Sequence, residues 1–492
     1  MDIKRCAFLF LALLLVTCSA SHYGSQQEQQ EQQELSAARQ CRLQQLSPSR
    51  PSKRIEAEGG VTEFWDQRED QLQCAGVSVR RHIIRRKSLL VPLYENTHGL
   101  LYIQQGRGFV GVSFPGCPES FHSSVRSPRP FEEGSSEQAQ FQTDSHQKVH
   151  RIRQGDTVAI VAGATHWFYN DGDQDLVAFT VFNVNHQDNQ LDPSVRMFLL
   201  AGQFLEQQSS YSRQESEREH ETESSSRESV VSAFDPKLMS EILNIPVETV
   251  RQMQRNEKKG HMVTIEQGLS FVRPAEQQEQ EGCMDEARPS SKETQFANGL
   301  EEAYCYARIQ HNLDTPEETD IYSRRAGRFM SVNSNKLPIL STIGMSMDKI
   351  NLRPDAIVAP HYTVNAHSIM FVTRGEGQMQ VVDNKGRNLF NGRVRQGDLI
   401  VVPQFYVTVK KAGRDGFEFV TFKTAPIPVR SPLFGHMSLF SGVPAQVIAS
   451  SYRISVGQAR QLKQCRQQHF MLFPPSSSSS SSSYHDADIA SA

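Results

Sequence analysis

Arg151-Ile152-Arg153-Gln154-Gly155-Asp156 decides the fold, because a near copy, Arg393-Val394-Arg395-Gln396-Gly397-Asp398, stands later in the same chain. A strand-like stretch that ends in a glycine turn precedes each copy, Leu100–Gly108 in the first case and Ile369–Gly377 in the second. A single hexapeptide can match by chance, but several matching elements in the same order indicate a tandem duplication. The chain therefore contains two copies of one structural unit.

Each unit begins with β structure. In the first unit, short apolar runs alternate with glycine-containing turns, which is typical of a β-sandwich or β-barrel. The runs are 76–79, 100–103, 109–112, 157–161 and 176–182. We therefore expect many short strands in each unit.

A pair of short helices follows the strands in each unit. In the first unit, Asp235 stands before Pro236 as an N-cap stands before the first helical residue, and Pro246 opens a second helix. In the second unit, Pro444 starts a short helix and Ser455 caps another. The order of strands and then helices is the same in both units, which supports the duplication.

The two units differ in net charge. Residues 21–298 contain about 29 Lys and Arg against 39 Asp and Glu, so this part is acidic. Residues 299–492 contain about 21 Lys and Arg against 15 Asp and Glu, so this part is basic. Because the basic residues are scattered among the predicted strands and do not cluster with aromatic residues, we expect attraction between the units and no nucleic-acid partner.

Residues 1–20 have the pattern of a secretory signal peptide, with Lys4 and Arg5, then the apolar run Phe8–Val16, then small residues up to Ala20. The apolar run is much shorter than the roughly 20 residues that span a bilayer, and no later stretch is long enough either. We therefore expect a protein of the secretory pathway that has no membrane anchor once the signal is removed.

Polar tracts rich in Gln, Glu, Ser and Arg separate the packed units. They contain too few apolar residues to offset the entropy lost on ordering, so we expect them to be disordered. The predicted organisation is a signal peptide at 1–20, a Gln-rich N-terminus at 21–40, the first β unit with its helices at 41–273 with a disordered loop at about 206–228, an acidic linker at 274–298, the second unit at 299–473 and a Ser-rich tail at 474–492.

Six cysteines remain after the signal is removed. In an oxidising compartment they can form disulfides, but the spacing does not choose among the possible pairings. No pair has the C-x-x-C spacing of zinc or redox sites. The six are Cys41, Cys74, Cys117, Cys283, Cys305 and Cys465.

Six further stretches together carry a resemblance to a known family. They are Ile55–Gly60, Leu72–Val77, Phe114–Glu119, His166–Gly172, Asn298–Glu302 and Ala359–Tyr362. From Cys41 to about Gln468 the chain resembles the bicupins, and within them the legumin-type (11S) seed storage globulins. The resemblance implies a mainly β fold with two tandem cupin (jelly-roll-like) β-barrels, each followed by a small helical extension.

The resemblance also implies a processing site and two disulfides. Asn298-Gly299 looks like the peptide bond that an asparaginyl endopeptidase cuts to give an acidic and a basic chain. Cys41 would pair with Cys74 inside the acidic chain, and Cys117 would pair with Cys305 across the cut. Cys283 and Cys465 fall outside the two disulfides of the family.

The implied function is storage of nitrogen and carbon in seeds, without enzymatic activity. The resemblance implies a route through the endoplasmic reticulum to the protein storage vacuole. It also implies self-association, first as trimers and, after cleavage, as hexamers.

A metal-dependent enzyme of the oxalate oxidase or decarboxylase type is the main alternative, because such cupins hold a metal ion with two histidine-containing motifs. In the first unit the earlier motif is reduced to His98. The residues that fit the later motif are Gly155, Asp156, Gly163, His166 and Asn170.

In the second unit, His361 fits the earlier motif, but Thr363 stands at the second histidine position and His367 lies near the glutamate position. Thr408 replaces the histidine of the later motif. A catalytic divalent metal needs at least three converging ligands. Neither unit supplies them, so we predict no catalytic residue, no metal and no cofactor.

Three weaker possibilities remain open from the sequence. If His361 and His367 lie on one barrel wall, they could bind copper or zinc adventitiously. A pocket for a small molecule or a sugar could exist in a barrel without a metal. A lectin-like role in defence is the third possibility.

Overall fold

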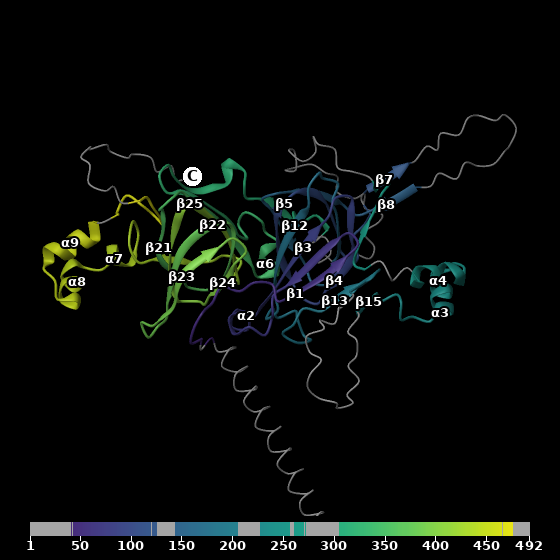
Figure 1. Cartoon of the computed structure of the whole chain (residues 1–492), viewed down its shortest axis with the longest axis horizontal. Coiled ribbons are helices and arrows are strands. Elements are labelled where there is room, and N and C mark those ends of the chain that lie inside the picture. Colours follow the sequence, from purple (N-terminus) through teal and green to yellow (C-terminus); the bar gives the residue numbers. More distant parts are fainter. Residues whose placement is uncertain are drawn as a thin grey trace, which may run out of the picture.

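The computed structural model describes residues 41, 43–119, 121–124, 143–204, 227–255, 260–269, 271, 305–464 and 466–475 (Figure 1). The signal peptide, the N-terminal stretch 21–40, the linker 274–298 and the Ser476–Ser483 run lie outside the described residues. So do the Asn298-Gly299 bond, Cys283, Cys465 and nearly all of the loop predicted at about 206–228.

Two β-barrels stand side by side, the first in purple and blue and the second in green (Figure 1). All the paired strands run antiparallel, and short helices follow the strands of each barrel. The predicted fold class, two tandem cupin barrels with helical extensions, is confirmed.

The first barrel consists of a seven-stranded sheet, in the order β1-β2-β3-β12-β5-β10-β17, and a six-stranded sheet, in the order β13-β4-β11-β6-β9 with β16 beside β4. Its strands are β1 (Lys53–Ala57), β2 (Gly60–Phe64), β3 (Val77–Ile84), β4 (Ser88–Glu95), β5 (Gly99–Gln105), β6 (Arg107–Ser113), β9 (Val149–Arg153), β10 (Asp156–Ile160), β11 (Thr165–Tyr169), β12 (Leu176–Asn183), β13 (Met197–Leu199), β16 (Met262–Thr264) and β17 (Gln310–Asn312). Two small hairpins join β7 (Phe121–Ser124) to β8 (Thr143–His146) and β14 (Gln203–Phe204) to β15 (Arg227–Glu228).

The second barrel is a single ten-stranded sheet in which two long strands, β22 and β25, pair along most of their length. Its strands are β18 (Thr319–Ser323), β19 (Gly327–Val332), β20 (Ser346–Leu352), β21 (Ile357–Thr363), β22 (Ser368–Val382), β23 (Asn388–Arg395), β24 (Leu399–Val402), β25 (Val407–Lys423), β26 (Arg430–Pro432) and β27 (Leu472–Phe473). A 3-10 turn, η3 (Pro316–Glu318), precedes β18.

The repeated hexapeptide forms the same turn in both barrels. Gly155 and Gly397 have φ values of +90° and +86°, a conformation that only glycine adopts without strain. The carboxylates of Asp156 and Asp398 accept a hydrogen bond from the backbone N–H three residues earlier, at 2.7 and 2.8 Å. The near identity of the two hexapeptides therefore reflects one turn used twice.

In each half, a segment that precedes the barrel pairs with the barrel of the other half. These two segments, the arms, are β17 and the stretch around Ser49. Strand β17, which precedes the second barrel, pairs with the edge strand β10 of the first barrel. In the reverse direction, Ser49 precedes the first barrel and exchanges two backbone hydrogen bonds with Leu399 of β24, at 2.7 and 2.9 Å. The equivalent edges of the two barrels are therefore covered reciprocally.

The aspartate of each hexapeptide fastens the incoming arm. Asp156 accepts hydrogen bonds from Asn312 Nδ2 at 2.6 Å and from Gln310 Nε2 at 2.8 Å. Asp398 accepts a hydrogen bond from Arg50 Nε at 2.9 Å. In both copies of the hexapeptide, the aspartate therefore binds a segment from the other half of the chain.

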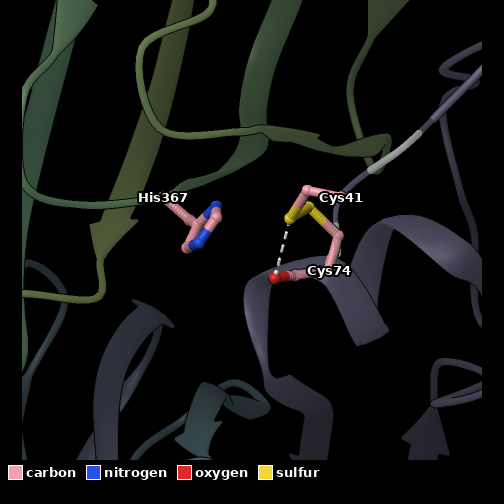
Figure 2. A group of neighbouring side chains, drawn as sticks. All are labelled: Cys41, Cys74 and His367. Carbon is pink, nitrogen blue, oxygen red and sulfur yellow. Dashed lines mark hydrogen bonds between the residues drawn. A yellow bond between two sulfur atoms is a disulfide. The ribbon is translucent and has the colours of Figure 1, made fainter. Parts of the chain in front are cut away.

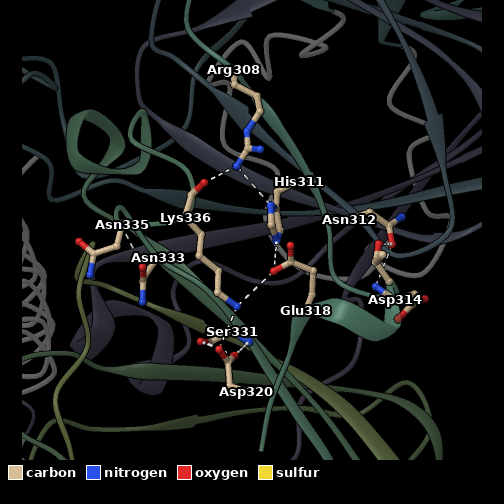
Figure 3. A network of polar contacts seen from close by, with 11 residues as sticks. Arg308, His311, Asn312, Asp314, Glu318, Asp320, Ser331, Asn333, Asn335 and Lys336 are labelled. Carbon is tan, nitrogen blue, oxygen red and sulfur yellow. Dashed lines mark hydrogen bonds and ion pairs between the residues drawn. The ribbon is translucent and has the colours of Figure 1, made fainter. Parts of the chain in front are cut away.

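A polar network holds the β17 arm to its own half as well (Figure 3). His311 Nε2 lies 3.2 Å from a carboxylate oxygen of Glu318, and Lys336 Nζ lies 3.2 Å from the same carboxylate. Lys336 Nζ also lies 2.9 Å from Asp320, which accepts two hydrogen bonds from Ser331. The arm is therefore fixed on both sides, by the first barrel and by the second half.

The apolar core of the first barrel extends to the face of the second barrel that packs against it. The rings of Phe179 in β12 and Phe371 in β22 stack with their centroids 4.2 Å apart, and Trp65 and Phe422 pack around them. Each arm also adds a buried leucine to the core of the opposite barrel. Leu313 packs into the core of the first barrel, and Leu46 packs into that of the second. Burial of apolar surface therefore joins the halves independently of the chain connection.

The two helices predicted for each half are present. Asp235 caps α3 (Pro236–Leu243) by accepting hydrogen bonds from two backbone N–H groups, and α4 (Val247–Arg255) follows. In the second half, α7 (Leu439–Gly442) and α8 (Ala445–Tyr452) precede α9 (Val456–Gln464). The two helix groups lie at opposite ends of the molecule (Figure 1). Two other short helices, α2 (Asp70–Ala75) and α6 (Leu340–Ile343), lie between strands.

In the described part of the chain, no helix is both long enough and apolar enough to cross a membrane.

Candidate functional site

The metal position of the first barrel is occupied by an ion pair. His166, on β11, is buried, and its Nδ1 lies 3.6 Å from the carboxylate of Glu95 on β4. That carboxylate is paired with Arg80 on β3, which is also buried. Burial lowers the pKa of His166, so the imidazole is neutral. A guanidinium in this place repels a divalent cation, so these residues do not fit a metal site.

Two further histidines of the first barrel share one hydroxyl group. Thr62 Oγ1 lies 2.9 Å from His82 Nδ1 and 2.6 Å from His261 Nε2. Burial and the nearby Arg80 charge together lower the pKa of both rings, that of His261 to about 3. Both histidines therefore stay neutral in the folded protein at neutral pH.

Asn170, the last residue of the predicted first-unit motif, has a structural role. Its Nδ2 donates hydrogen bonds to the carbonyl oxygens of Ile84 and Gln174, and its Oδ1 accepts one from the Gly172 N–H. The side chain is therefore fully used in closing a turn next to β11.

His98 does not point to the same place as His166. Its Nδ1 accepts a hydrogen bond from the Ala162 N–H at 3.0 Å, so the proton is on Nε2, which lies 2.9 Å from Asp188. The ring of His186 packs edge-on against His98. This group already satisfies its hydrogen bonds, and the proton on Nε2 would have to leave before a metal could bind there.

In the second barrel, the metal-ligand positions surround two buried lysines. His361 on β21 faces Thr408 on β25 in the strand register. Thr408 Oγ1 accepts a hydrogen bond from Lys410 Nζ at 3.4 Å, and Thr363 Oγ1 accepts one from Lys423 Nζ at 3.1 Å. The barrel therefore holds positive side chains of its own in the place where a cupin enzyme holds a metal.

The electrostatics of this interior also disfavour a cation. Burial, together with the charge of Lys423, lowers the pKa of Lys410 to about 7, and burial lowers the pKa of Lys423 to about 8. The pKa of His361 is lowered by burial and by both lysines, so this ring is neutral. Its Nδ1–H donates to the Ala359 carbonyl oxygen at 2.7 Å.

His367 lies in different surroundings from His361. Its Nδ1 accepts a hydrogen bond from the Gln404 N–H at 3.2 Å, and the ring faces the Cys41–Cys74 disulfide (Figure 2). His361, by contrast, lines the interior cavity with the lysines. The two imidazoles therefore have different surroundings, which does not support the idea that they line one metal-binding wall.

Among the described residues, two groups of three possible ligands have their donor atoms within 4.8 Å of one another. One is His98, His186 and Asp188, described above. The other is Cys41, Cys74 and His367, in which the two sulfur atoms are bonded to each other and are not free to bind a metal. Within the part of each barrel that the structure describes, three free ligands do not come together at the cupin metal position.

The buried charges at the cupin metal positions are not predicted by the sequence pattern. Strand periodicity could have found Lys410, because residues two apart in a strand share one face and Thr408 was already placed at a ligand position. Lys423, Arg80 and Glu95 carried no comparable signal, since charged residues in strands are usually exposed.

Both disulfides implied by the resemblance are present. Cys41 and Cys74 are joined with their Cα atoms 4.7 Å apart, and Cys117 and Cys305 with theirs 5.3 Å apart. Gln147 holds the loop of Cys117 by donating to its carbonyl oxygen at 2.9 Å. The second disulfide joins the two halves of the chain across 188 residues.

Comparison with known proteins agrees with this geometry. The cupin family matches residues 46–206 and 311–460. An 11S globulin seed storage protein of Sesamum indicum is 43% identical over 89% of this chain and 93% of its own. The chain belongs to the 11S seed storage globulins. Glutelin type-A 1 of Oryza sativa subsp. japonica is 38% identical over 96% of both chains.

Solved structures place this globulin in the same group. It matches the coconut allergen cocosin with a TM-score of 0.74 and 35% identity, over 88% of this chain and 100% of that one. Pumpkin seed globulin gives a TM-score of 0.74 at 32% identity, over 88% and 99%. The globulin is thus a non-enzymatic seed storage protein, and the predicted storage function is confirmed.

Proposed function

We propose that this storage globulin is made as a precursor, which an asparaginyl endopeptidase cuts between Asn298 and Gly299. The products are an acidic chain and a basic chain, in agreement with the charge difference between the two parts of the sequence. The observation that carries the proposal is the Cys117–Cys305 disulfide, which has one cysteine on each side of that bond. A cut there leaves the two chains covalently joined.

Two further features would hold the cut molecule together. The reciprocal arms pair β17 with β10 and Ser49 with Leu399, so each chain contributes an edge to the barrel of the other. The apolar core between the barrels adds the stacked rings of Phe179 and Phe371. Neither feature depends on the peptide bond at 298–299.

The test is digestion of the folded precursor with an asparaginyl endopeptidase. Wild type should give one band on a non-reducing denaturing gel and two bands on a reducing gel, the smaller of which starts at Gly299. The Asn298→Gln variant should stay whole, while Asn335→Gln, at an exposed asparagine of the second half, should be cut like wild type. Cutting of Asn298→Gln at the same place would overturn the proposal.

We also propose that the precursor forms trimers through the helical extensions. The helix groups at the two ends of the molecule expose large apolar side chains. These include Leu238 and Ile242 at one end, and Val447 and Tyr452 at the other. Two different patches that bind head to tail can close a ring, and the cut then allows two trimers to stack as a hexamer.

Sedimentation velocity tests this assembly. Ile242, 64% exposed on α3, should be essential, so Ile242→Glu should sediment as a monomer. Leu191 is similarly exposed, at 57%, but lies outside the helices, and Leu191→Glu should remain trimeric. Cut wild type should form hexamers and uncut Asn298→Gln should not. A trimeric Ile242→Glu protein, or hexamers of uncut chains, would contradict the assignment.

The storage site that we propose is the protein storage vacuole of seeds, reached through the endoplasmic reticulum. The secretory pattern of residues 1–20 and the family support this route. Immunogold labelling of seed sections tests it. Label over vacuolar protein bodies is expected, and label confined to the cytosol would refute it.

A pocket in the first barrel supports a second candidate function, binding of a small aromatic acid. The pocket has a volume of about 220 Å³. Its lining includes the rings of Trp65, Phe182 and Phe204 and the cationic side chains Lys53 and Arg80. Aromatic walls suit a flat ring, and cations suit a carboxylate. An 11S globulin of Wrightia tinctoria, 34% identical with a TM-score of 0.73 over 88% of this chain, is described as having an auxin binding site.

Tryptophan fluorescence tests this candidate, because the chain has two tryptophans and only Trp65 lines the pocket. In a Trp167→Phe protein, phenylacetate, an aromatic acid whose ring does not emit in the tryptophan range, should change the emission of Trp65 saturably. Lys53→Glu should weaken the binding by placing a negative charge at the pocket. A linear, unsaturable response in the Trp167→Phe protein would rule the pocket out.

A further inference from the structure

The interior of the second barrel contains more positive than negative charge. Lys410 and Lys423, both on β25, are 5% and 3% exposed, and Arg430 on β26 lies beside them. Asp348 on β20 is the carboxylate that faces this group. Three cationic side chains therefore share one anion in a largely buried space.

Asp348 is already engaged by Arg430. The Nε of Arg430 donates to Oδ2 of Asp348 at 3.2 Å, and a terminal nitrogen of the guanidinium pairs with Oδ1. This two-point geometry is the strong form of an arginine–carboxylate pair. Little of the Asp348 charge is therefore left for the two lysines.

The lysine ammonium groups contact only uncharged acceptors. Lys423 Nζ donates to Ser368 Oγ at 2.6 Å and to Thr363 Oγ1 at 3.1 Å. Lys410 Nζ has one long bond, to Thr408 Oγ1 at 3.4 Å, and lies over the ring of Phe419. Among the described residues, no carboxylate lies within 4 Å of either ammonium group, although an ammonium can donate three hydrogen bonds.

Lys349 shows how this chain treats a buried lysine elsewhere. It is also nearly fully buried, but its Nζ pairs with Asp314 and lies 3.7 Å from Glu418. An isolated buried charge is costly, so buried charges are normally paired. The contrast with Lys349 indicates that the partner of Lys410 and Lys423 is not among the residues that the structure describes.

A cavity of about 20 Å³ lies between these groups. Its lining includes both lysines, the hydroxyl groups of Thr408 and Ser368, and the neutral ring of His361. A volume of this size holds one water-sized particle and has no room for sulfate or phosphate. Ammonium and hydroxyl groups are hydrogen-bond donors, and donors that converge on one small space suit a single anionic atom.

We propose that this cavity binds one halide ion, chloride in the physiological case, between the ammonium groups of Lys410 and Lys423. The ion neutralises the excess positive charge of the barrel interior and satisfies the lysine protons that lack an acceptor. The second barrel thus replaces the metal cation of the cupin enzymes by an anion site. The rival arrangement is a neutral lysine and a water molecule.

Bromide tests the site, because it resembles chloride and scatters anomalously. Crystals of the full chain are soaked in sodium bromide, and anomalous differences are measured at the bromine edge. We expect a peak inside the second barrel, between Lys410 and Lys423. Lys410→Met should abolish this peak, whereas Lys349→Met, which removes a buried lysine with its own carboxylates, should leave it.

Solution measurements keep the test independent of crystals. Line broadening of the ³⁵Cl NMR signal should reveal one site in wild type and in Lys349→Met, and the site should be absent in Lys410→Met. Circular dichroism checks that Lys410→Met is folded, which we expect because an apolar side chain replaces an unpaired buried charge. If Lys410→Met does not fold, Lys410→Gln takes its place in both experiments. A feature in the cavity without anomalous signal, or unchanged broadening in a folded Lys410 variant, would overturn the proposal.

Discussion

Removal of the aspartate at the end of the repeated hexapeptide should have unequal effects in the two halves. Asp156 and Asp398 occupy equivalent positions and make the same hydrogen bond within their turns, at 2.7 and 2.8 Å. This shared contribution cancels when Asp156→Ala is compared with Asp398→Ala. The difference in unfolding free energy between the variants therefore reports the bonds to the arms.

The structure gives the size of that difference. Asp156 accepts two hydrogen bonds from the arm residues Gln310 and Asn312, and a bond to a charged acceptor contributes about 1.5–3 kcal/mol. Burial raises the pKa of Asp156, so desolvation offsets part of this gain, and we take about 3 kcal/mol for the pair. The side chain of Arg50 is 61% exposed, and an exposed ion pair with Asp398 contributes about 0–1 kcal/mol. Asp156→Ala should thus cost about 2–3 kcal/mol more than Asp398→Ala.

Urea-induced unfolding of the full chain, followed by circular dichroism at one protein concentration, measures both variants. Asn312→Ala should cost less in the Asp156→Ala background than in wild type, because the bond to Asp156 is already lost there, while the other hydrogen bonds of Asn312 count in both backgrounds. Equal losses for the two aspartate variants, within about 0.5 kcal/mol, would refute the reasoning, as would a larger loss at Asp398.

Three further predictions follow from the core, the buried histidines and the second barrel. Phe371→Ala should lower the unfolding free energy by about 3–5 kcal/mol, while Phe405→Ala, at an exposed ring, should change it by less than about 0.5 kcal/mol in the same urea assay. As the pH falls below 6.5, the unfolded chain binds protons that the folded chain does not, because burial holds the pKa of His261 at about 3. About 2–3 kcal/mol should therefore be lost by pH 4.5 through this residue, and His261→Gln should have a flatter stability profile than wild type; equal slopes would contradict this. After dialysis against zinc, wild type and His361→Asn should contain the same amount of zinc by elemental analysis, and one equivalent less in the variant would show that a metal does bind there.

The parts of the fold that the sequence predicted are those with a local cause. The turn in each hexapeptide needs a glycine with positive φ, at Gly155 and at Gly397, so the sequence predicts the same turn in both halves. The helices that begin at Pro236 and Val456 each follow a capping residue, which bonds backbone N–H groups two or three positions later. Asp235 and Ser455 accept the expected backbone hydrogen bonds.

The features that the sequence did not predict depend on contacts between distant residues. The exchange of arms joins Gln310 to Asp156 and Ser49 to Leu399, and neither pair is visible in a local pattern. The ion pair of Arg80 with Glu95 is also missed, because a charged residue in a strand is ordinarily exposed.

The exchange of arms gives the proposed cut between Asn298 and Gly299 a physical meaning. A chain whose halves were separate barrels on a tether would depend on the disulfide alone after cleavage. Here the arm that begins after Cys305 completes the first barrel through β17, and the segment around Ser49 completes the second. Cleavage of the linker between the halves therefore removes a connection that the packed structure does not need.

A denaturing gel of the mature protein from its own tissue, run with and without reductant, tests the central claim most directly, together with sequencing of the N-terminus of the smaller band. We expect one band that becomes two on reduction, with the smaller chain starting at Gly299 and joined to the larger through Cys117–Cys305. A single full-length band in both lanes would contradict processing at this bond. Two bands without reductant would contradict the disulfide between the chains.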